Sequence, residues 1–266
     1  MNLTDQEFDF LRKLLYEAAG INLTPEKKAL VIGRLTRRIE SLGLTSYGEY
    51  FRRIAGNLDP VERQWALDAL TTNETYFFRE PPHFAYLSET IVPNVQPGES
   101  FRVWSAASSS GEEAYSIAML LGERLGQRPW EIIGSDLSTK VLEKARRGQY
   151  SMERAEKIPK PYLRDFCLKG TGEQDGTFLI DPQLRKRVSF QQANLMGPLP
   201  KLGLFDVIFL RNVLIYFDLP TKRRVVDNLL PYMKPGGYFF SGHSESLTGL
   251  VEGLTPIKPA IYRKAN

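Results

Sequence analysis

Two polar segments of the sequence carry residue types that could bind and react with a small molecule. The first, TTNETYFFREPP at residues 71–82, combines the amide of Asn73 with the hydroxyl of Thr75 and the guanidinium of Arg79. The second, RVWSAASSSGEEAYS at residues 102–116, is typical of a strand, a loop of small residues and a helix that opens with two glutamates. We expect these segments to form two walls of one ligand pocket.

The loop from Ala106 to Gly111 follows the first expected strand, where dinucleotide-binding folds hold a pyrophosphate. Its small residues permit close approach, but Glu112 and Glu113 would repel phosphate and suit a cationic or hydroxyl-bearing ligand. Asp136 ends the second expected strand, where an acid binds ribose hydroxyls. A positively charged nucleoside such as S-adenosylmethionine fits these groups better than a dinucleotide. On the residues alone, the glutamates could equally serve only to complement the helix dipole.

Length and composition describe an ordinary globular protein. The 266 residues suit one large domain, or a domain with a smaller partner. The formal net charge of +4 says little about partners, and the single cysteine, Cys167, fits a reducing compartment. The first ten residues carry three acids and no basic stretch, and no apolar run reaches the ~18 residues of a membrane-spanning helix. We expect a cytoplasmic protein that does not insert into a membrane.

The two histidines, His83 and His243, stand far apart in the sequence. Together with a lone cysteine, they lack the close spacing typical of zinc-binding motifs. The sequence therefore predicts no metal site.

Residues 1–70 predict a small all-helical domain, because apolar residues recur there at helical spacing between capping residues. Four helices are expected: one that ends at Gly20, one from Pro25 to Gly43, one from Ser46 to Ile54, and one that starts at Asp59-Pro60.

From Phe101 onward, short β-rich runs alternate with helical patterns, which indicates a parallel sheet covered on both faces. The expected strands are residues 101–105, 131–135, 187–190, 205–210 and 238–241, the last preceded by a turn at 235–237, with a closing antiparallel pair at 254–257 and 260–263. The expected helices are residues 111–125, 138–147 and 219–233. Residues 149–186 break the alternation and predict an inserted subdomain with a hairpin.

Six ordered motifs resemble those of the CheR family of chemoreceptor glutamate methyltransferases: TTNETYFFRE, RVWSAASSSGEEAYSIAM, SDLSTKVLEKA, QANL, FLRNVLIYFD and GHSESL. The resemblance covers nearly the whole chain. It implies an α/β fold with the Rossmann-like sheet of class I S-adenosylmethionine-dependent methyltransferases, a small all-α N-terminal domain and an inserted β-hairpin subdomain. The implied divisions are a receptor-docking domain at 1–70, a linker at 71–90 that lines the cofactor site, and a methyltransferase domain at 91–266 with the insertion at about 149–186.

The resemblance also implies which residues contact S-adenosylmethionine. Asn73, Thr75 and Arg79 would meet its methionine end, with Glu113 near the amino group. Asp136 would bind the ribose hydroxyls. The remaining implied cofactor contacts are Ala106 in the loop, Asn194 and Leu195 beside the adenine, and Asn212 and Val213 at the pocket floor. The product would be S-adenosylhomocysteine, and no metal is expected.

The implied reaction transfers a methyl group from the sulfonium to a glutamate side chain of a chemoreceptor. A glutamate with a pKa near ~4.3 is already ionised at neutral pH, so no general base is required. Arg79 would aim the carboxylate with its planar fork, and Tyr216 would assist through its hydroxyl. Alternatively, Arg79 pairs with Glu74 or Glu80, and Tyr216 only packs. Three neighbouring aromatic residues would exclude water: Tyr76, Phe77 and Phe78.

The second expected helix carries four basic residues on one arc beside its apolar stripe: Lys27, Arg34, Arg37 and Arg38. Such a run is usually only a solvated face. The resemblance instead implies a basic ridge that docks the acidic helical cytoplasmic domain of a chemoreceptor. The insertion, with its loop GTGEQDG, resembles the subdomain that in some relatives adds a receptor's C-terminal pentapeptide to its sheet. We expect a monomer.

Two other functions stay open. A nucleic-acid methyltransferase on the same fold would need a broad basic face and an Asn/Asp-Pro-Pro-aromatic motif, which residues 211–216 do not match. A catalytically inactive module would keep the cofactor pocket without the transfer, and only an activity measurement separates it from an enzyme.

Overall fold

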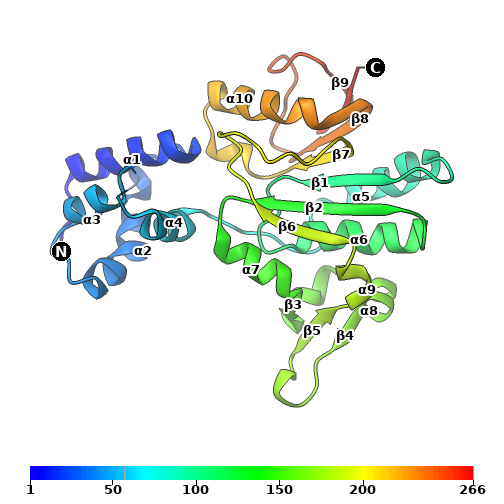
Figure 1. Cartoon of the computed structure of the whole chain (residues 1–266), viewed down its shortest axis with the longest axis horizontal. Coiled ribbons are helices and arrows are strands. Elements are labelled where there is room, and N and C mark those ends of the chain that lie inside the picture. Colours follow the sequence, from blue (N-terminus) through cyan, green and yellow to red (C-terminus); the bar gives the residue numbers. More distant parts are fainter. Residues whose placement is uncertain (57, 266) are drawn as a thin grey trace.

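The computed structural model describes residues 1–56 and 58–265, in which a helical N-terminal part stands beside a larger α/β part (Figure 1). The N-terminal helices are α1 (Asp5–Ala19), α2 (Lys28–Ser41, after a 3₁₀ turn at Pro25–Lys27), α3 (Tyr47–Ile54) and α4 (Pro60–Leu70). They confirm the helices predicted from the sequence. Thr4 and Glu7 form a capping box at α1, Asp59 caps α4, and Gly20 ends α1 with a left-handed φ of 71°.

A buried carboxylate ties the helical part together. The side chain of Glu62, 4% exposed, accepts hydrogen bonds from Arg38 Nε at 3.0 Å and Nη2 at 2.5 Å, and from the Tyr50 hydroxyl at 2.8 Å. Burial opposes ionisation, but the bonds from Arg38 and Tyr50 prevail and hold the pKa of Glu62 below its ordinary value. These bonds join α2, α3 and α4 within one apolar cluster.

The α/β part is built on a seven-stranded sheet with the order β6-β2-β1-β7-β8-β10-β9. Five strands run parallel: β1 (Phe101–Ser105), β2 (Trp130–Asp136), β6 (Val188–Gln192), β7 (Phe205–Leu210) and β8 (Met233–Ser241). The closing strands β9 (Leu254–Lys258) and β10 (Ile261–Lys264) form an antiparallel pair, and β10 runs antiparallel to β8. The predicted parallel sheet and its closing pair are both present.

Helices cover both faces of this sheet, which is why its central strands β1 and β7 are mostly apolar and buried. On one face, Val103 of β1 packs with Ile117 of α6 (Glu112–Leu125) and with α5 (Pro81–Tyr86). On the other face, Trp104 packs with Val225 of α10 (Leu219–Leu229). Helix α7 (Thr139–Arg147) contacts β2 and β6. Short 3₁₀ turns occupy Val92–Asn94, Met152–Lys157, Gly172–Gln174, Leu214–Tyr216 and Leu230–Tyr232, and a π-helical turn occupies Leu87–Ile91.

Two local predictions differ from the structure. Strand β8 runs through residues 235–237, which the sequence predicted as a turn. The pairing of β8 with β7 shifts register beside them, and Gly236 has a φ of 71°, so the Pro-Gly-Gly sequence forms an irregularity within the strand. Helix α10 ends at Leu229 instead of Met233, since Pro231 cannot continue it. The predicted linker at 71–90 contains α5, and the boundary between the domains stays a prediction.

The insertion forms a small antiparallel sheet with the order β3-β5-β4 (Figure 1). The predicted hairpin of β4 (Cys167–Lys169) and β5 (Thr177–Ile180) is joined by a third strand, β3 (Gln149–Ser151), and is flanked by α8 (Lys160–Phe166) and α9 (Pro182–Arg185). Phe178 of β5 is buried against Tyr150 and Phe77, with ring centroids 5.6 and 5.8 Å away. The subdomain is thereby packed onto the segment at residues 71–82.

Among the described residues, no helix combines the length and the apolar character that crossing a membrane requires.

Replacing Glu62 with glutamine should lower the free energy of unfolding by about 2 kcal/mol at pH 7, since Arg38 and Tyr50 lose a charged acceptor in the core. The folded-state pKa of Glu62 is depressed, so its contribution is present above the unfolded value of 4.5 and is lost as pH falls through the folded pKa. Urea unfolding over descending pH measures both effects. E40Q, on the exposed side of α2, is the control. A stability difference that does not shrink in acid would contradict this account.

Candidate active site

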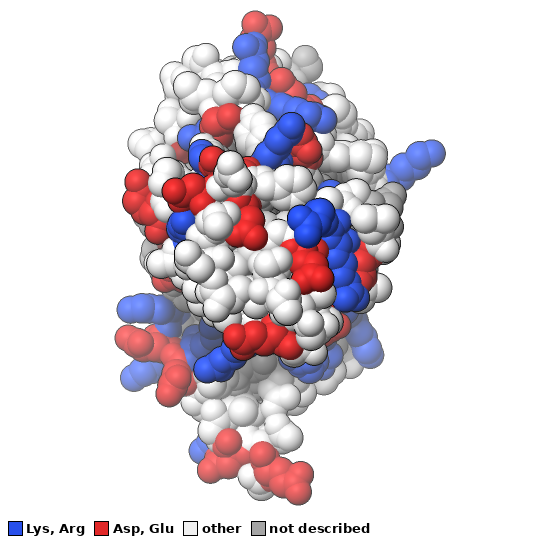
Figure 2. All heavy atoms as spheres, turned by 90° about the vertical axis from the view of Figure 1, so that its left-hand side faces the viewer, with Lys and Arg blue, Asp and Glu red and all other residues white. Residues whose placement is uncertain are grey.

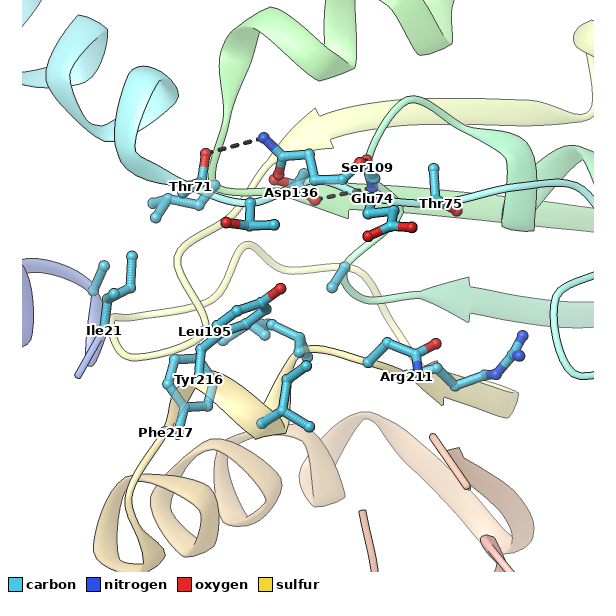
Figure 3. A pocket seen from close by; sticks show the side chains of 18 of the residues that line it. Ile21, Thr71, Glu74, Thr75, Ser109, Asp136, Leu195, Arg211, Tyr216 and Phe217 are labelled. Atoms are coloured by element: carbon cyan, nitrogen blue, oxygen red, sulfur yellow. Dashed lines mark hydrogen bonds between the residues drawn. The ribbon is translucent and has the colours of Figure 1, made fainter. Parts of the chain in front are cut away.

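A pocket with a volume of about 370 Å³ lies at the carboxyl ends of the parallel strands, between the sheet and the helical part. Strand β1 lies between β2 and β7, so the chain turns from it toward opposite edges of the sheet. Open α/β sheets form their ligand crevice at such a point. Figure 3 shows Asp136 and Ser109 on one side of the cavity, with Leu195, Tyr216 and Phe217 across from them.

The first wall is organised around the carboxylate of Asp136, which is 9% exposed. One oxygen accepts the backbone N–H of Ser109 and the other that of Ser138, both at 2.9 Å. Ser109 has a φ of 48°, a left-handed conformation held by this bond and by its hydroxyl, which donates to the carbonyl of Asn73 at 2.9 Å. Burial raises the pKa of Asp136. The two polar segments therefore meet directly at Ser109, as expected for two walls of one pocket.

A buried guanidinium organises the opposite end of the pocket. The side chain of Arg211, 1% exposed, donates to Glu113 at 3.0 Å and to Glu80 at 3.1 Å, and also to the backbone carbonyl of Arg79. Glu113 further accepts the hydroxyl of Ser105 at 2.7 Å. Burial raises the pKa of Glu113, whereas the pKa of Glu80 is lowered, because Arg211 and neighbouring donors outweigh its burial. Arg211 thus joins three separate segments around the pocket.

The loop after β7 is held in an uncommon conformation by the same network. Asn212 has a φ of 58°, its backbone N–H donates to Glu245 at 2.7 Å, and its side-chain amide donates to Glu80 at 3.1 Å. Glu245 is buried and also accepts the backbone N–H groups of Gly242 and Ile215 at 2.8 and 3.0 Å. The end of β7 is therefore clamped between two carboxylates.

The structure brings every predicted cofactor residue to this one pocket. Its lining includes Asn73, Thr75, Arg79, Ala106, Glu113, Asp136, Asn194, Leu195, Asn212 and Val213, together with Tyr216. They come from the segment before α5, from the end of β2, from the start of α6 and from the loops that follow β1, β6 and β7. What each of them binds stays a prediction.

Arg79 takes neither of the ion pairs considered as alternatives in the described structure. Its Nη1 donates to the backbone carbonyl of Glu74 at 3.0 Å, and its guanidinium lies 5.5 Å from the centre of the Tyr76 ring. Because a guanidinium has five N–H donors, this arrangement leaves further donors for a ligand.

Two predictions about the pocket walls are wrong. Of the three aromatics expected to exclude water, only Tyr76 lines the pocket. Phe77 packs into the insertion, and Phe78 stacks on Tyr162 with centroids 5.4 Å apart. Other aromatic rings line the pocket instead: Phe84 and Phe217.

Of the two glutamates that open α6, only Glu113 reaches the pocket. Glu112 is buried on another side, where it accepts the Ser110 hydroxyl at 2.7 Å and pairs with Arg154 of the insertion. Its role is therefore to connect α6 to the inserted subdomain, and a cationic ligand of the pocket would meet only one of these two carboxylates.

Sequence reasoning missed two contributors to the site. Arg211 follows an apolar strand as a single charge, and nothing local marks it as buried. The helical part supplies a wall through the loop after α1, including Ile21 and Leu23. Asn22 N–H donates to the carbonyl of Tyr216 at 3.1 Å, and Asn194 donates to the carbonyl of Ala18 at 2.6 Å across 176 residues of sequence. No short-range signal predicts such contacts.

The four basic residues predicted to dock a receptor lie in different environments. Arg38 is bound to Glu62, and Arg34 donates to the backbone carbonyls of Ala69 and Thr71 at 3.2 and 2.9 Å. Lys27 and Arg37 are exposed, and Lys27 also borders the pocket. Figure 2, which faces the helical part, shows basic and acidic side chains mixed over this side.

Comparison with known proteins gives the family. A model of the CheR methyltransferase all-alpha domain matches residues 6–71, and one of the CheR methyltransferase SAM binding domain matches residues 73–262. This chain belongs to the CheR methyltransferase family. The predicted family and fold class are confirmed, and the protein is an S-adenosylmethionine-dependent methyltransferase.

Two relatives that match over nearly their whole length are chemotaxis protein methyltransferases. The chain is 41% identical to "Chemotaxis protein methyltransferase 2" of Pseudomonas aeruginosa, over 98% of this chain and 94% of that one. It is 40% identical to "Chemotaxis protein methyltransferase" of Escherichia coli, over 98% and 91%. A solved structure of the glycopeptide N-methyltransferase MtfA complexed with sinefungin matches 74% of this chain and 62% of that one, with a TM-score of 0.40 and 18% identity.

Proposed function

We propose that this protein methylates glutamate side chains in the cytoplasmic helical domain of chemoreceptors, producing glutamate methyl esters and S-adenosylhomocysteine. One observation carries the proposal: Arg79, a cation suited to a carboxylate, faces the same pocket as the carboxylates of Glu113 and Asp136, which suit the cofactor. We further propose that the protein acts in the cytoplasm, as a monomer, without binding nucleic acid. The mixed charges in Figure 2 support a protein partner over nucleic acid, which would favour a broad basic face.

The donors and acceptors of the pocket fit S-adenosylmethionine. Asp136 has its oxygens positioned by two backbone amides and retains lone pairs for the ribose hydroxyls. Glu113 shares the guanidinium of Arg211 with Glu80, and the remaining lone pairs of Glu113 suit an ammonium group. Apolar lining from Ala106, Leu195 and Val213 suits the uncharged parts of a nucleoside. The polar residues assigned to the rest of the cofactor are Asn73, Thr75, Asn194 and Asn212.

The side chains of this protein would then position the substrate and exclude water from it. The bound cofactor would supply an electrophilic methyl group. Arg79 would hold the incoming carboxylate by paired N–H groups, and the Tyr216 hydroxyl would approach from the opposite wall. The carboxylate arrives ionised, so no side chain has to remove a proton. Dispersal of charge during transfer is favoured where Tyr76, Phe84 and Phe217 keep water away.

Incubation with methyl-labelled S-adenosylmethionine and receptor cytoplasmic fragments tests the proposal. We expect labelled receptor that releases volatile methyl in alkali, which marks a carboxyl ester and excludes methylated amines and nucleic acid. Cofactor binding without any transfer would instead favour the inactive module.

Replacing Arg79 with alanine should slow methyl transfer by about a hundred-fold or more, because no guanidinium then orients the substrate carboxylate toward the methyl group. Cofactor affinity should change by less than about ten-fold, since the pocket's carboxylates remain. Calorimetry with S-adenosylhomocysteine and the labelled-methyl assay measure the two quantities. R79K, which keeps the charge but not the fork, should recover part of the rate. Near-normal turnover in R79A would remove Arg79 from the mechanism.

Replacing Asp136 with asparagine should weaken cofactor binding by about ten- to a hundred-fold, through loss of charge-assisted hydrogen bonds. Burial raises the pKa of Asp136, so the wild-type carboxylate protonates at a higher pH than an ordinary aspartate. Ligand hydroxyls favour the ionised form, so wild-type affinity should fall as pH drops through this pKa, and the D136N profile should be flatter. Calorimetry over a pH series measures this, with the exposed D175N as the control. Unchanged affinity in D136N would exclude the ribose role.

We propose that the basic ridge of Lys27, Arg34, Arg37 and Arg38 docks the receptor, with the exposed members making the contact. Reversal of Arg34 or Arg38 would also break bonds that hold the helical part together, so Arg37 is the informative position.

Arg37→Glu should slow association with the receptor fragment several-fold at low salt, and the difference should vanish at high salt. Stopped-flow or surface-based kinetics measure the on-rate. R52E makes the same charge change at an exposed position of α3 and should have a smaller effect. Equal slowing by both variants would reject a localised ridge.

We also propose that the small sheet of the insertion binds a receptor C-terminal pentapeptide. Strands β3 and β4 are its edges, and Leu168 and Lys169 of β4 are exposed. An edge strand offers unpaired backbone groups to an extended peptide.

A further inference from the structure

Three possible metal ligands meet beside the pocket, although the sequence separates them widely. Oε2 of Glu80 lies 3.4 Å from Nδ1 of His83 and 4.0 Å from Nε2 of His243. One ligand atom from each residue lies within 4.8 Å of the others, and the two imidazole rings stand nearly perpendicular with centroids 4.8 Å apart. None of the three lines the cofactor pocket. The prediction of no metal site assumed that the two histidines lie far apart, whereas the structure brings them close together.

The imidazole of His83 lacks the partners that its burial requires. The side chain is 1% exposed, and among the described residues neither ring nitrogen makes a hydrogen bond. A neutral imidazole carries one donor and one acceptor, and leaving either of them buried without a partner destabilises the fold.

The spacing suits coordination better than hydrogen bonding. Zinc bonds of ~2.0–2.1 Å in a tetrahedral site place neighbouring ligand atoms about 3.3–3.4 Å apart. Glu80 and His83 already stand at 3.4 Å without forming a hydrogen bond. The side chain of His243 is 49% exposed, so it can adjust by rotation to close its 4.0 Å separation. Its exposure also leaves a fourth position for water.

The surrounding charge can accommodate a cation. Glu80 accepts four N–H groups: two from Arg211 at Oε2, and one each from the Asn212 side chain and the His243 backbone at Oε1. An ion at Oε2 would replace the longer bond from Arg211, which Nε donates at 3.4 Å, and would leave the bond from Nη2 at 3.1 Å. The Arg211 guanidinium pairs with two carboxylates, those of Glu80 and Glu113, and Glu245 lies nearby, where it accepts the backbone N–H of Asn212.

We propose that Glu80, His83 and His243 form a binding site for a divalent transition metal, with zinc as the metal best suited to one carboxylate and two imidazoles. The ion would brace Glu80 and, through it, Arg211 and Asn212 in the wall of the cofactor pocket. The site is separate from the methyl-transfer chemistry, and its occupancy is independent of the proposed function.

Zinc titration of the full chain, freed of any tag and treated with chelator, tests the proposal by calorimetry without cofactor or receptor. We expect one zinc ion per chain and a higher unfolding temperature. The chain contains only two histidines and one cysteine, so few other soft ligands compete. H243A, at a half-exposed position, should weaken binding at least ten-fold. H83F, which keeps a ring against Phe240, should do the same.

C167S, which removes the chain's one thiol, is the matched control and should bind zinc as the wild type does. Cobalt substitution gives a second readout, because its visible absorption reports the coordination geometry. Absence of saturable zinc binding in the wild type would overturn the proposal. So would full binding by H243A, a variant whose folding does not depend on the buried ring.

Discussion

The site depends on one buried cation. Arg211 stands at the end of a central strand, and its guanidinium binds Glu113 at the start of α6, Glu80 at the start of α5, and the carbonyl of Arg79. A buried charge of this kind is tolerated only when it is paired, and breaking such a pair is strongly destabilising. Arg211 therefore holds three segments at fixed positions relative to one another. Arg79 is placed beside the pocket because its backbone carbonyl accepts a hydrogen bond from the Arg211 guanidinium.

Strained backbone occurs at both ends of the pocket, at Glu80 and Asn212 near Arg211 and at Ser109 beside Asp136. Glu80, Asn212 and Ser109 all have left-handed φ angles without being glycine, at 58°, 58° and 48°. Such conformations persist only where surrounding bonds over-determine them, and each of these residues is held by a carboxylate or is itself a bonded carboxylate. These conformations lower the stability of the fold, and the bonds that hold them keep the loops after β1 and β7 rigid. A pocket of this kind is pre-formed instead of assembled by its ligand.

The sequence predicted the parts of this site that depend on local order. Asp136 and Glu113 could be found because strand ends and helix starts have recognisable patterns, and the motifs then placed the remaining lining residues. The prediction for Phe77 and Phe78 was wrong because the chain turns at these residues, where Phe78 has a φ of 54°, and both rings pack against the insertion, a tertiary contact that the local sequence does not indicate. Arg211, the loop after α1 and the meeting of His83 with His243 rest on tertiary contacts that leave no local pattern.

The wall that the helical part contributes has a thermodynamic consequence. Ile21 and Leu23 line the same cavity as Asp136, so a ligand that fills the pocket contacts both parts of the chain. Such a ligand holds the two parts together. It stabilises the folded arrangement by a free energy that grows with the logarithm of the ligand concentration. By reciprocity, a partner that shifts the loop after α1 must change the affinity of the pocket by the same factor. A partner that binds the helical part and a ligand that fills the pocket would therefore be thermodynamically linked.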